Sequence, residues 1–205
     1  MQRGNMMSIG TRYELILCRE RRFADLLADE IVERPRLSAW MVVIPIIFVQ
    51  YLLAYKEMKP ALEAVAREFI TTKKAALSAA FDMVESDEPK EQVLAGCLSS
   101  PEGGYAKPAK EIHRQQLKEI DLLVDHYVKL LKAEGDSHDS LLKNAYLTRI
   151  GYEQFLNLLQ QAEKEVNRAV NRAFSQKKDY AEMLSKTEVA AEALRTAEMN
   201  TIFPV

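Results

Sequence analysis

Glycine and proline are scarce in this sequence, with seven of each among 205 residues. Both residues end or interrupt helices, so their scarcity leaves room for long uninterrupted helical segments. Alanine, leucine, glutamate, lysine, arginine and glutamine are abundant instead, and these residues have the highest intrinsic helix propensities. We therefore expect an all-α protein, built as a bundle of long amphipathic helices.

An excess of basic charge is also lacking. The 28 lysines and arginines are matched by 30 aspartates and glutamates, which gives a formal net charge of −2. Proteins that bind nucleic acids depend on a basic face that neutralises several phosphates. The charge balance therefore argues against nucleic acid as a partner.

Cysteine is rare, and its two copies are far apart in the sequence. Neither Cys18 nor Cys97 belongs to a Cys-x-x-Cys or Cys/His cluster, so the sequence predicts no disulfide scaffold and favours a reducing, cytoplasmic setting for the soluble part. The first ten residues have no basic region leading into a short apolar one. We therefore expect no cleaved secretory signal, with an uncleaved signal anchor as the alternative.

Recognisable catalytic motifs are missing as well. The sequence has no Gly-x-Ser-x-Gly elbow, no glycine-rich dinucleotide turn and no His-Glu-x-x-His pair. Helical di-iron proteins use Glu-x-x-His pairs, but none of the histidines, at positions 113, 126 and 138, has a carboxylate three residues before it. We therefore predict no catalytic residue, no metal and no cofactor, and favour a protein that is not an enzyme.

One stretch, Leu37 to Tyr55, differs from the rest of the chain. Sixteen of its nineteen residues are apolar, none is charged, and only Ser38, Pro45 and Gln50 interrupt it. A helix needs about 20 apolar residues to cross a hydrocarbon core of about 30 Å, and aromatic rings near its ends suit the head-group level. The sequence predicts insertion into a membrane or a protein core through Trp40, Ile44, Pro45, Ile47, Phe48, Gln50, Tyr51, Leu52 and Tyr55.

Three arrangements of this segment stay open. A single helix could span the membrane, although five basic residues within twenty positions on each side give no orientation. A bend at Pro45, which cannot donate a backbone hydrogen bond, would give two arms of about 15 Å and a re-entrant insertion with both ends in the cytoplasm. The third arrangement is the buried central helix of a soluble bundle.

The rest of the sequence places apolar residues at helical spacing. Amphipathic helices are predicted over residues 13–33, 61–85, 109–134, 138–174 and 177–200, with a short helix after Pro89 that ends near Gly96. The turn-rich segment 99–108 is a candidate subdomain boundary. The chain thus divides into an N-terminal amphipathic segment, 1–36, a hydrophobic segment, 37–59, and a helical bundle, 60–205.

A repeated tetrad, Val-Asn-Arg-Ala, covers residues 166–173. It places Arg168 and Arg172 one helical turn apart, with Asn167 and Asn171 beside them. A partner with a stripe of carboxylates would fit this candidate partner surface. A solvated helix face remains the better interpretation, because charge runs usually face water.

These observations favour a membrane-associated helical accessory or scaffold protein that acts through protein–protein contacts and has no catalysis of its own. Its expected partners are membrane lipid and either another protein or a second copy of the chain, and its helical domain would lie in the cytoplasm. The alternative is a soluble dimeric bundle with Leu37 to Tyr55 as its central helix. A second alternative is a helical enzyme that binds a metal or a small ligand through His113, Glu119, Asp125 and His126.

Overall fold

The computed structural model describes residues 7–32, 58–97, 107–173 and 178–204. This part of the chain is all-α and contains seven helices and no strand. The helices are α1 (Ile9–Val32), α3 (Met58–Ser86), α4 (Lys90–Cys97), α5 (Lys107–Lys132), α6 (His138–Tyr146), α7 (Arg149–Ala173) and α8 (Lys178–Ile202). The prediction of an all-α helical bundle is confirmed.

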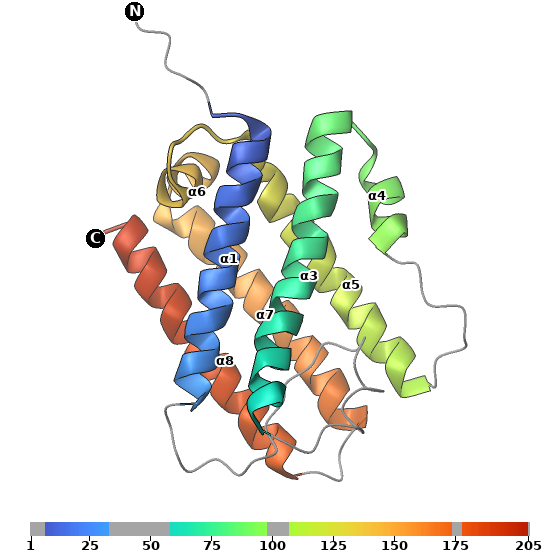
Figure 1. Cartoon of the computed structure of the whole chain (residues 1–205). Coiled ribbons are helices and arrows are strands. Elements are labelled where there is room, and N and C mark those ends of the chain that lie inside the picture. The colour runs from blue at the N-terminus through green and yellow to red at the C-terminus, as the bar shows by residue number, and fades with distance from the viewer. Residues whose placement is uncertain (1–6, 33–57, 98–106, 174–177, 205) are drawn as a thin grey trace, which may run out of the picture.

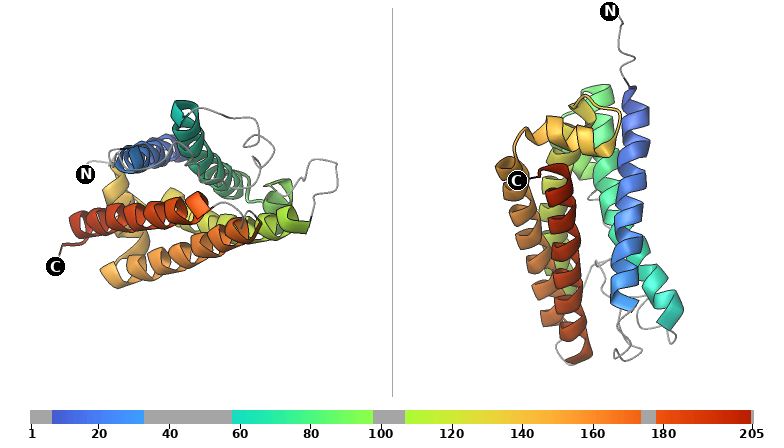
Figure 2. Two further views of the ribbon diagram at one scale, coloured as in Figure 1. Left: turned by 90° about the horizontal axis from the view of Figure 1, so that it is seen from below. Right: turned by 90° about the vertical axis from the view of Figure 1, so that its left-hand side faces the viewer.

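The five long helices form a closed circuit, in which each packs against the next, and α1 also contacts α5. Helix α1 packs on α3, α3 on α5, α5 on α7, α7 on α8, and α8 returns to α1. Figure 2 shows α1 and α3 on one side of the molecule and α7 and α8 on the other. The short helix α6 lies across one end of this circuit, and α4 lies outside it, against α3 (Figure 1).

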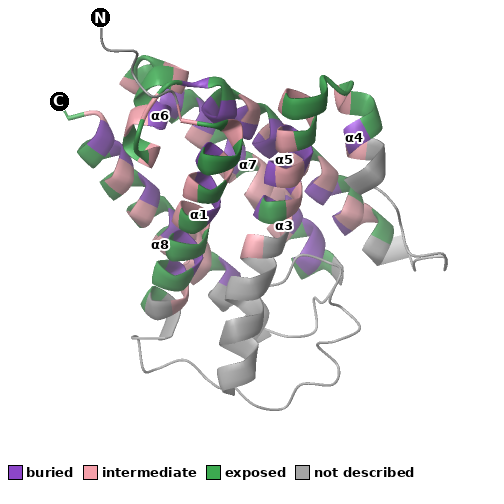
Figure 3. Cartoon of the chain, turned by 45° about the horizontal axis from the view of Figure 1, so that its top comes forward, coloured by how far each residue is buried: buried purple, intermediate pink, exposed green. Residues whose placement is uncertain are grey.

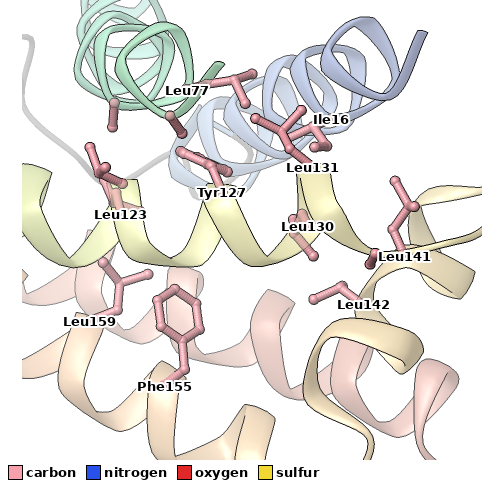
Figure 4. Packing of buried hydrophobic residues seen from close by; sticks show 14 of the residues in the cluster. Ile16, Leu77, Leu123, Tyr127, Leu130, Leu131, Leu141, Leu142, Phe155 and Leu159 are labelled. Carbon is pink, nitrogen blue, oxygen red and sulfur yellow. The ribbon is translucent and has the colours of Figure 1, made fainter. Parts of the chain in front are cut away.

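The main hydrophobic core lies on both sides of α5 (Figure 4). Tyr127 of α5 is fully buried, and Ile16 of α1 and Leu77 of α3 pack on one side of this helix. Phe155 and Leu159 of α7 pack on the other side. Full burial of one such aliphatic side chain contributes about 1.5–3 kcal/mol, so α1 is held in the same core as the later helices.

Each long helix buries one face and exposes the other (Figure 3). In α1, the buried residues Ile16, Phe23 and Leu27 recur at intervals of seven and four, as expected for the inner stripe of an amphipathic helix. Phe23 and Leu27 also pack against Ala191 of α8 in a smaller cluster. The apolar side chains that recur at helical spacing in the sequence therefore face the interior of the folded bundle.

The prediction of one continuous helix over residues 138–174 is wrong. Helix α6 ends at Tyr146 and α7 begins three residues later. Between them, Leu147 has φ 60° and ψ −34°, a combination outside the helical region. A Cβ atom on Gly151 would lie 3.0 Å from the carbonyl oxygen of Tyr146. This glycine therefore allows α7 to begin directly against the end of α6.

The apolar segment Leu37 to Tyr55 lies outside the described residues, and so do all nine of its predicted insertion residues. The same holds for the prediction that it forms a strongly hydrophobic helix. Among the helices that the structure does describe, none is both long enough and apolar enough to cross a membrane. The neighbouring elements are described: α1 ends and α3 begins at the same end of the bundle (Figure 1).

Candidate functional site

A set of charged and polar side chains, here called the internal polar cluster, lies inside the bundle. Lys73, Glu119, His126 and Arg195 each expose 9% or less of their surface. Because every long helix contributes, only the folded bundle assembles the cluster. Its members are Arg19 and Glu20 from α1, Lys73 from α3, Glu119, His126 and Tyr127 from α5, His138 from α6, Tyr152 and Glu163 from α7, and Arg195 and Glu198 from α8.

Glu20 and Lys73 join α1 to α3 within the cluster. The Lys73 ammonium nitrogen lies 3.1 Å from Oε2 of Glu20, and the hydroxyl of Tyr127 donates a 2.9 Å hydrogen bond to Oε1 of the same carboxylate. Burial by itself would raise the pKa of Glu20, but the charge and hydrogen bond of Lys73 lower it below its ordinary value. Glu20 is therefore ionised at neutral pH despite its burial.

Glu163 and Arg195 join α7 to α8 in the same way. Two guanidinium nitrogens of Arg195 donate to the two carboxylate oxygens of Glu163, over 2.6 Å and 2.5 Å. This fork-to-fork geometry is the strongest form of arginine–carboxylate pairing. The ring of Phe23 lies close to both buried cations, with its centre 5.6 Å from the Arg195 guanidinium carbon and 5.7 Å from the Lys73 nitrogen.

Glu119 lies near these pairs on α5. Burial, strengthened by the nearby carboxylate of Glu163, raises its pKa to about 8, although Lys73 and Arg195 act in the opposite direction. The carboxyl of Glu119 is therefore mostly protonated and uncharged at neutral pH. A buried carboxyl of this kind makes the cluster sensitive to pH.

His126 is also uncharged. Its ring stacks on Phe155, with centres 4.1 Å apart and planes 5° apart, and its Nδ1 is hydrogen-bonded to the hydroxyl of Tyr146 over 2.7 Å. Burial lowers the pKa of His126 to about 3, even though the carboxylate of Glu20 raises it. The imidazole is therefore a packed aromatic group at physiological pH.

Arg19 and Glu198 form the third ion pair, which joins α1 to α8. Two guanidinium nitrogens of Arg19 donate to Oε1 of Glu198 over 2.8 Å and 2.6 Å. The cluster then contains three cations, each matched by one carboxylate from another helix. Charge within the cluster is balanced when Glu119, His126 and His138 are neutral.

A cavity of about 30 Å³ opens inside the cluster. Glu20, Lys73, His126 and Arg195 are among the side chains that line it, together with His138. A cavity of this size has room for water but is far smaller than the volume of about 300–1,000 Å³ that organic ligands need. The buried Nδ1 of His138 has no hydrogen-bond partner in the described part of the chain, so the cavity offers a polar partner to water.

A shallow groove of about 210 Å³ runs over the surface between α1 and α8. Leu26, Leu194 and Ile202 supply apolar walls, and the Arg19–Glu198 pair borders both the groove and the cavity. The ion pair therefore separates the internal polar cluster from solvent on this side. Neither space reaches the size of a typical ligand site.

The four residues of the candidate partner surface lie on α7, but their side chains have different surroundings. The Asn167 amide donates to Glu188 of α8 over 2.7 Å, so it contributes to packing between α7 and α8. Arg168 is exposed and pairs with Glu165 of its own helix over 2.5 Å. Arg172 and Asn171 are exposed, and the Arg172 Nε donates to the backbone oxygen of Arg168.

The residues that the sequence offered for a metal or small-ligand site are not brought together. Glu119 and His126 are buried, whereas the carboxylate of Asp125 is exposed and lies 2.6 Å from the ammonium of Lys90 on α4. Among the described residues, no group of three His, Cys, Asp or Glu side chains could hold a metal ion. The geometry therefore gives the metal hypothesis no support.

Sequence reasoning missed the ion pairs of the internal polar cluster, although a signal was present. Glu20 occupies the apolar stripe of α1 between Ile16 and Phe23, and Arg195 occupies that of α8 between Ala191 and Met199. A charged residue at a position that belongs to the apolar stripe of a helix indicates a buried side chain that is paired with an opposite charge or a hydrogen-bond partner.

Comparison of the chain with protein-family models, with curated proteins and with solved structures finds no match. Its function must therefore be argued from its own residues.

Proposed function

We propose that this chain is a membrane-associated helical accessory or scaffold protein, which acts through protein–protein contacts and carries out no catalysis of its own. The observation behind this proposal is the uncharged apolar run from Leu37 to Tyr55, together with the position of its two neighbours, α1 and α3, at one end of the bundle. The run would attach the bundle to the lipid, and the bundle would present its surface to partners.

The packing of α1 favours the re-entrant form of insertion over a single crossing. A single crossing would leave α1 and α3 on opposite sides of the membrane. Ile16 and Leu17 of α1, however, are buried in one core with Leu77 of α3 and Tyr127 of α5. Exposing both α1 side chains would cost about 1.5–3 kcal/mol each, and the Glu20–Lys73 pair would also be lost. Entry and exit on one side preserve these contacts.

The interior of the bundle supports a scaffold role. The ions of the internal polar cluster are paired with one another, and the cavity among them, about 30 Å³, is far smaller than ligand sites of about 300–1,000 Å³. Catalytic sites combine ionisable groups with space for a substrate. In this bundle the same groups hold helices together, so the working surface of the protein is its exterior.

Fractionation of the full-length protein tests the membrane attachment. The wild type is expected in the membrane fraction and the double variant Pro45→Glu/Ile46→Glu in the soluble fraction, because two charges in a half-length insertion are costly. Val189→Glu/Ala193→Glu, which adds two charges at exposed positions of α8, is the matched control and should fractionate like the wild type. Recovery of the wild type in the soluble fraction would refute the attachment and favour the soluble dimer.

Single-cysteine labelling separates re-entrant insertion from a crossing. In a background of Cys18→Ser and Cys97→Ser, the variants Ser8→Cys and Ser86→Cys place one thiol at an exposed position just before α1 and one at the end of α3. In sealed vesicles, a membrane-impermeant maleimide should label both thiols or neither. Labelling of one position alone would show that α1 and α3 lie on opposite sides of the membrane.

A further inference from the structure

The corner between α6 and α7 contains an unusual backbone turn at Leu147. The backbone N–H of Thr148 donates to the carbonyl oxygen of Tyr146 over 2.6 Å, which closes a three-residue turn with Leu147 at its centre. With φ 60° and ψ −34°, this turn approaches the classic γ-turn, which is rare and strained. Glycine or asparagine usually occupies a position of positive φ at the end of a helix, so leucine is an unfavourable residue for this backbone.

The side chain of Leu147 is exposed as well as strained. It exposes 80% of its surface, and Ile150, at the start of α7, exposes 67%. The turn therefore carries a cost in backbone energy and presents a large apolar group to water. Residues with an unfavourable backbone conformation are often found at functional sites. An exposed apolar side chain is typical of a surface that contacts another molecule.

Ile150 begins an uncharged ridge along the outer face of α7. Gln154 and Leu158 follow at intervals of four residues, which places the three side chains in one of the rows through which packed helices interdigitate. Leu158 exposes 54% of its surface. Leu147, Ile150 and Leu158 account for three of the five large apolar side chains recorded as exposed in the described residues.

We propose that this ridge is the centre of a two-fold interface between two copies of the chain, with the two α7 helices antiparallel and the axis beside Gln154. Ile150 and Leu158 lie four residues to either side of Gln154, so Ile150 of each copy packs on Leu158 of the other. The Gln154 amide has both donors and an acceptor, so two such amides can bond to each other at the axis. Leu147 lies beyond Ile150 and extends the apolar contact at each end.

The symmetry of the ridge identifies a second copy as the occupant. An isologous interface requires a surface that is complementary to itself, and the order apolar, amide, apolar reads the same in both directions. No residue of the ridge is charged, so two copies bring no like charges together at the axis. The apolar centre is small compared with the area of about 800 Å² per partner in standard interfaces. We therefore expect a weak dimer whose population rises with concentration.

Sedimentation of the full-length protein over a concentration series tests the interface, in detergent if the protein requires it. The double variant Ile150→Glu/Leu158→Glu should raise the dissociation constant at least about tenfold, which corresponds to about 1.4 kcal/mol. Helicity should stay unchanged because both positions are exposed. Val189→Glu, at an apolar position of α8 that is 60% exposed, is the matched control and should leave association unchanged.

Disulfide trapping locates the axis independently of any other contact between copies. In a background of Cys18→Ser and Cys97→Ser, the variant Gln154→Cys should form a covalent dimer on mild oxidation, because the axis places this residue beside its own copy. Ala193→Cys on exposed α8 should remain monomeric. A wild type that stays monomeric, a double variant that associates like the wild type, or trapping through Ala193→Cys alone would each overturn the proposal.

Leu147→Gly separates the two roles of the corner residue. Glycine relieves the strain of a positive φ, so the midpoint of thermal unfolding should rise by about 2–12 °C. The same change removes an apolar contact, so association should weaken. A fall in the unfolding midpoint, or an unchanged dissociation constant, would contradict the role assigned to Leu147.

Discussion

Replacing Lys73 by methionine is the most direct test of the internal polar cluster, because it removes one charge and keeps a similar chain length. The Lys73 ammonium lies 3.1 Å from the Glu20 carboxylate and 5.7 Å from the centre of the Phe23 ring. In the variant, Glu20 keeps the hydrogen bond from Tyr127 but loses the cation that offsets the cost of its burial. The expected result is a folded but clearly destabilised protein.

The magnitude follows from the burial of both partners. Lys73 and Glu20 have side chains that are 6% and 13% exposed, and removal of one member of such a buried pair costs about 3–5 kcal/mol. For a protein of this size, each kcal/mol lowers the unfolding temperature by about 2–4 °C. We therefore expect the unfolding temperature of Lys73→Met to fall by about 6–20 °C.

The pH dependence adds a second readout. In the wild type, Lys73 lowers the pKa of Glu20, so Glu20 contributes stability above its unfolded pKa of about 4.3, and this stability is lost as the pH falls. In Lys73→Met, burial without the cation raises the pKa of Glu20 above the unfolded value. The variant should then be least stable near neutral pH and should approach the wild type as the pH falls toward 4.

Thermal and denaturant unfolding, followed by circular dichroism, measure these differences. Lys74→Met, at the exposed neighbouring position, is the control and should stay within about 0.5 kcal/mol of the wild type. The double variant Glu20→Gln/Lys73→Met should recover much of the lost stability because it leaves no unpaired buried charge. A Lys73→Met protein as stable as the control would refute the reasoning, as would a double variant no better than the single one.

Three further predictions concern α5 and the corner before α7. Because the pKa of Glu119 is raised to about 8, this residue binds more protons in the folded than in the unfolded state between about pH 4.3 and 8, so its contribution to stability should fall as the pH rises through this window. Between pH 5 and pH 8, urea unfolding should therefore show that the wild type loses stability relative to Glu119→Gln. Because the pKa of His126 is lowered to about 3, its neutral form contributes stability above about pH 6.5 that is lost on acidification. Between pH 7 and pH 5, His126→Phe should therefore lose less stability than the wild type. An equal loss would contradict the neutral state assigned to His126. Gly151→Ala should lower stability by about 1–3 kcal/mol in thermal unfolding, because its Cβ would lie 3.0 Å from a backbone oxygen that cannot easily move.

Apolar periodicity is sufficient to predict where most helices lie. The predicted helix over residues 61–85 corresponds to α3, Met58–Ser86, and the one over 109–134 corresponds to α5, Lys107–Lys132. These helices bury continuous stripes of apolar side chains, such as Leu123, Tyr127 and Leu130 of α5. The residues that give the sequence its helical periodicity are therefore the ones that pack in the core.

The break between α6 and α7 could not be predicted in this way. Its apolar residues keep a helical spacing across the corner, and the break depends on the backbone of Leu147, a residue that rarely takes a positive φ. Gly151 has a low helix propensity, but that does not locate the break, because what matters is its distance from the oxygen of Tyr146. A turn that contradicts local preference has no sequence signature.

The internal polar cluster could not be predicted from the sequence for a different reason. The arginines near residue 20 and the lysines at 73 and 74 resemble solvated charge runs, and that is the usual place for such residues. Lys73 and Lys74 nevertheless differ completely: one is buried beside Glu20, and the other is exposed. Only their positions relative to the apolar stripe of α3 separate them, since Lys73 lies four residues before the buried Leu77.

The three ion pairs of the internal polar cluster, two of them buried and one at its edge, add to the apolar contacts in defining which helices are neighbours. Each joins a different pair of helices: Glu20–Lys73 joins α1 to α3, Glu163–Arg195 joins α7 to α8, and Arg19–Glu198 joins α8 to α1. Apolar side chains tolerate a helix that slides or rotates, whereas a buried charge displaced from its partner costs several kcal/mol. Helix α1 takes part in two of the pairs, so its position against both α3 and α8 is fixed.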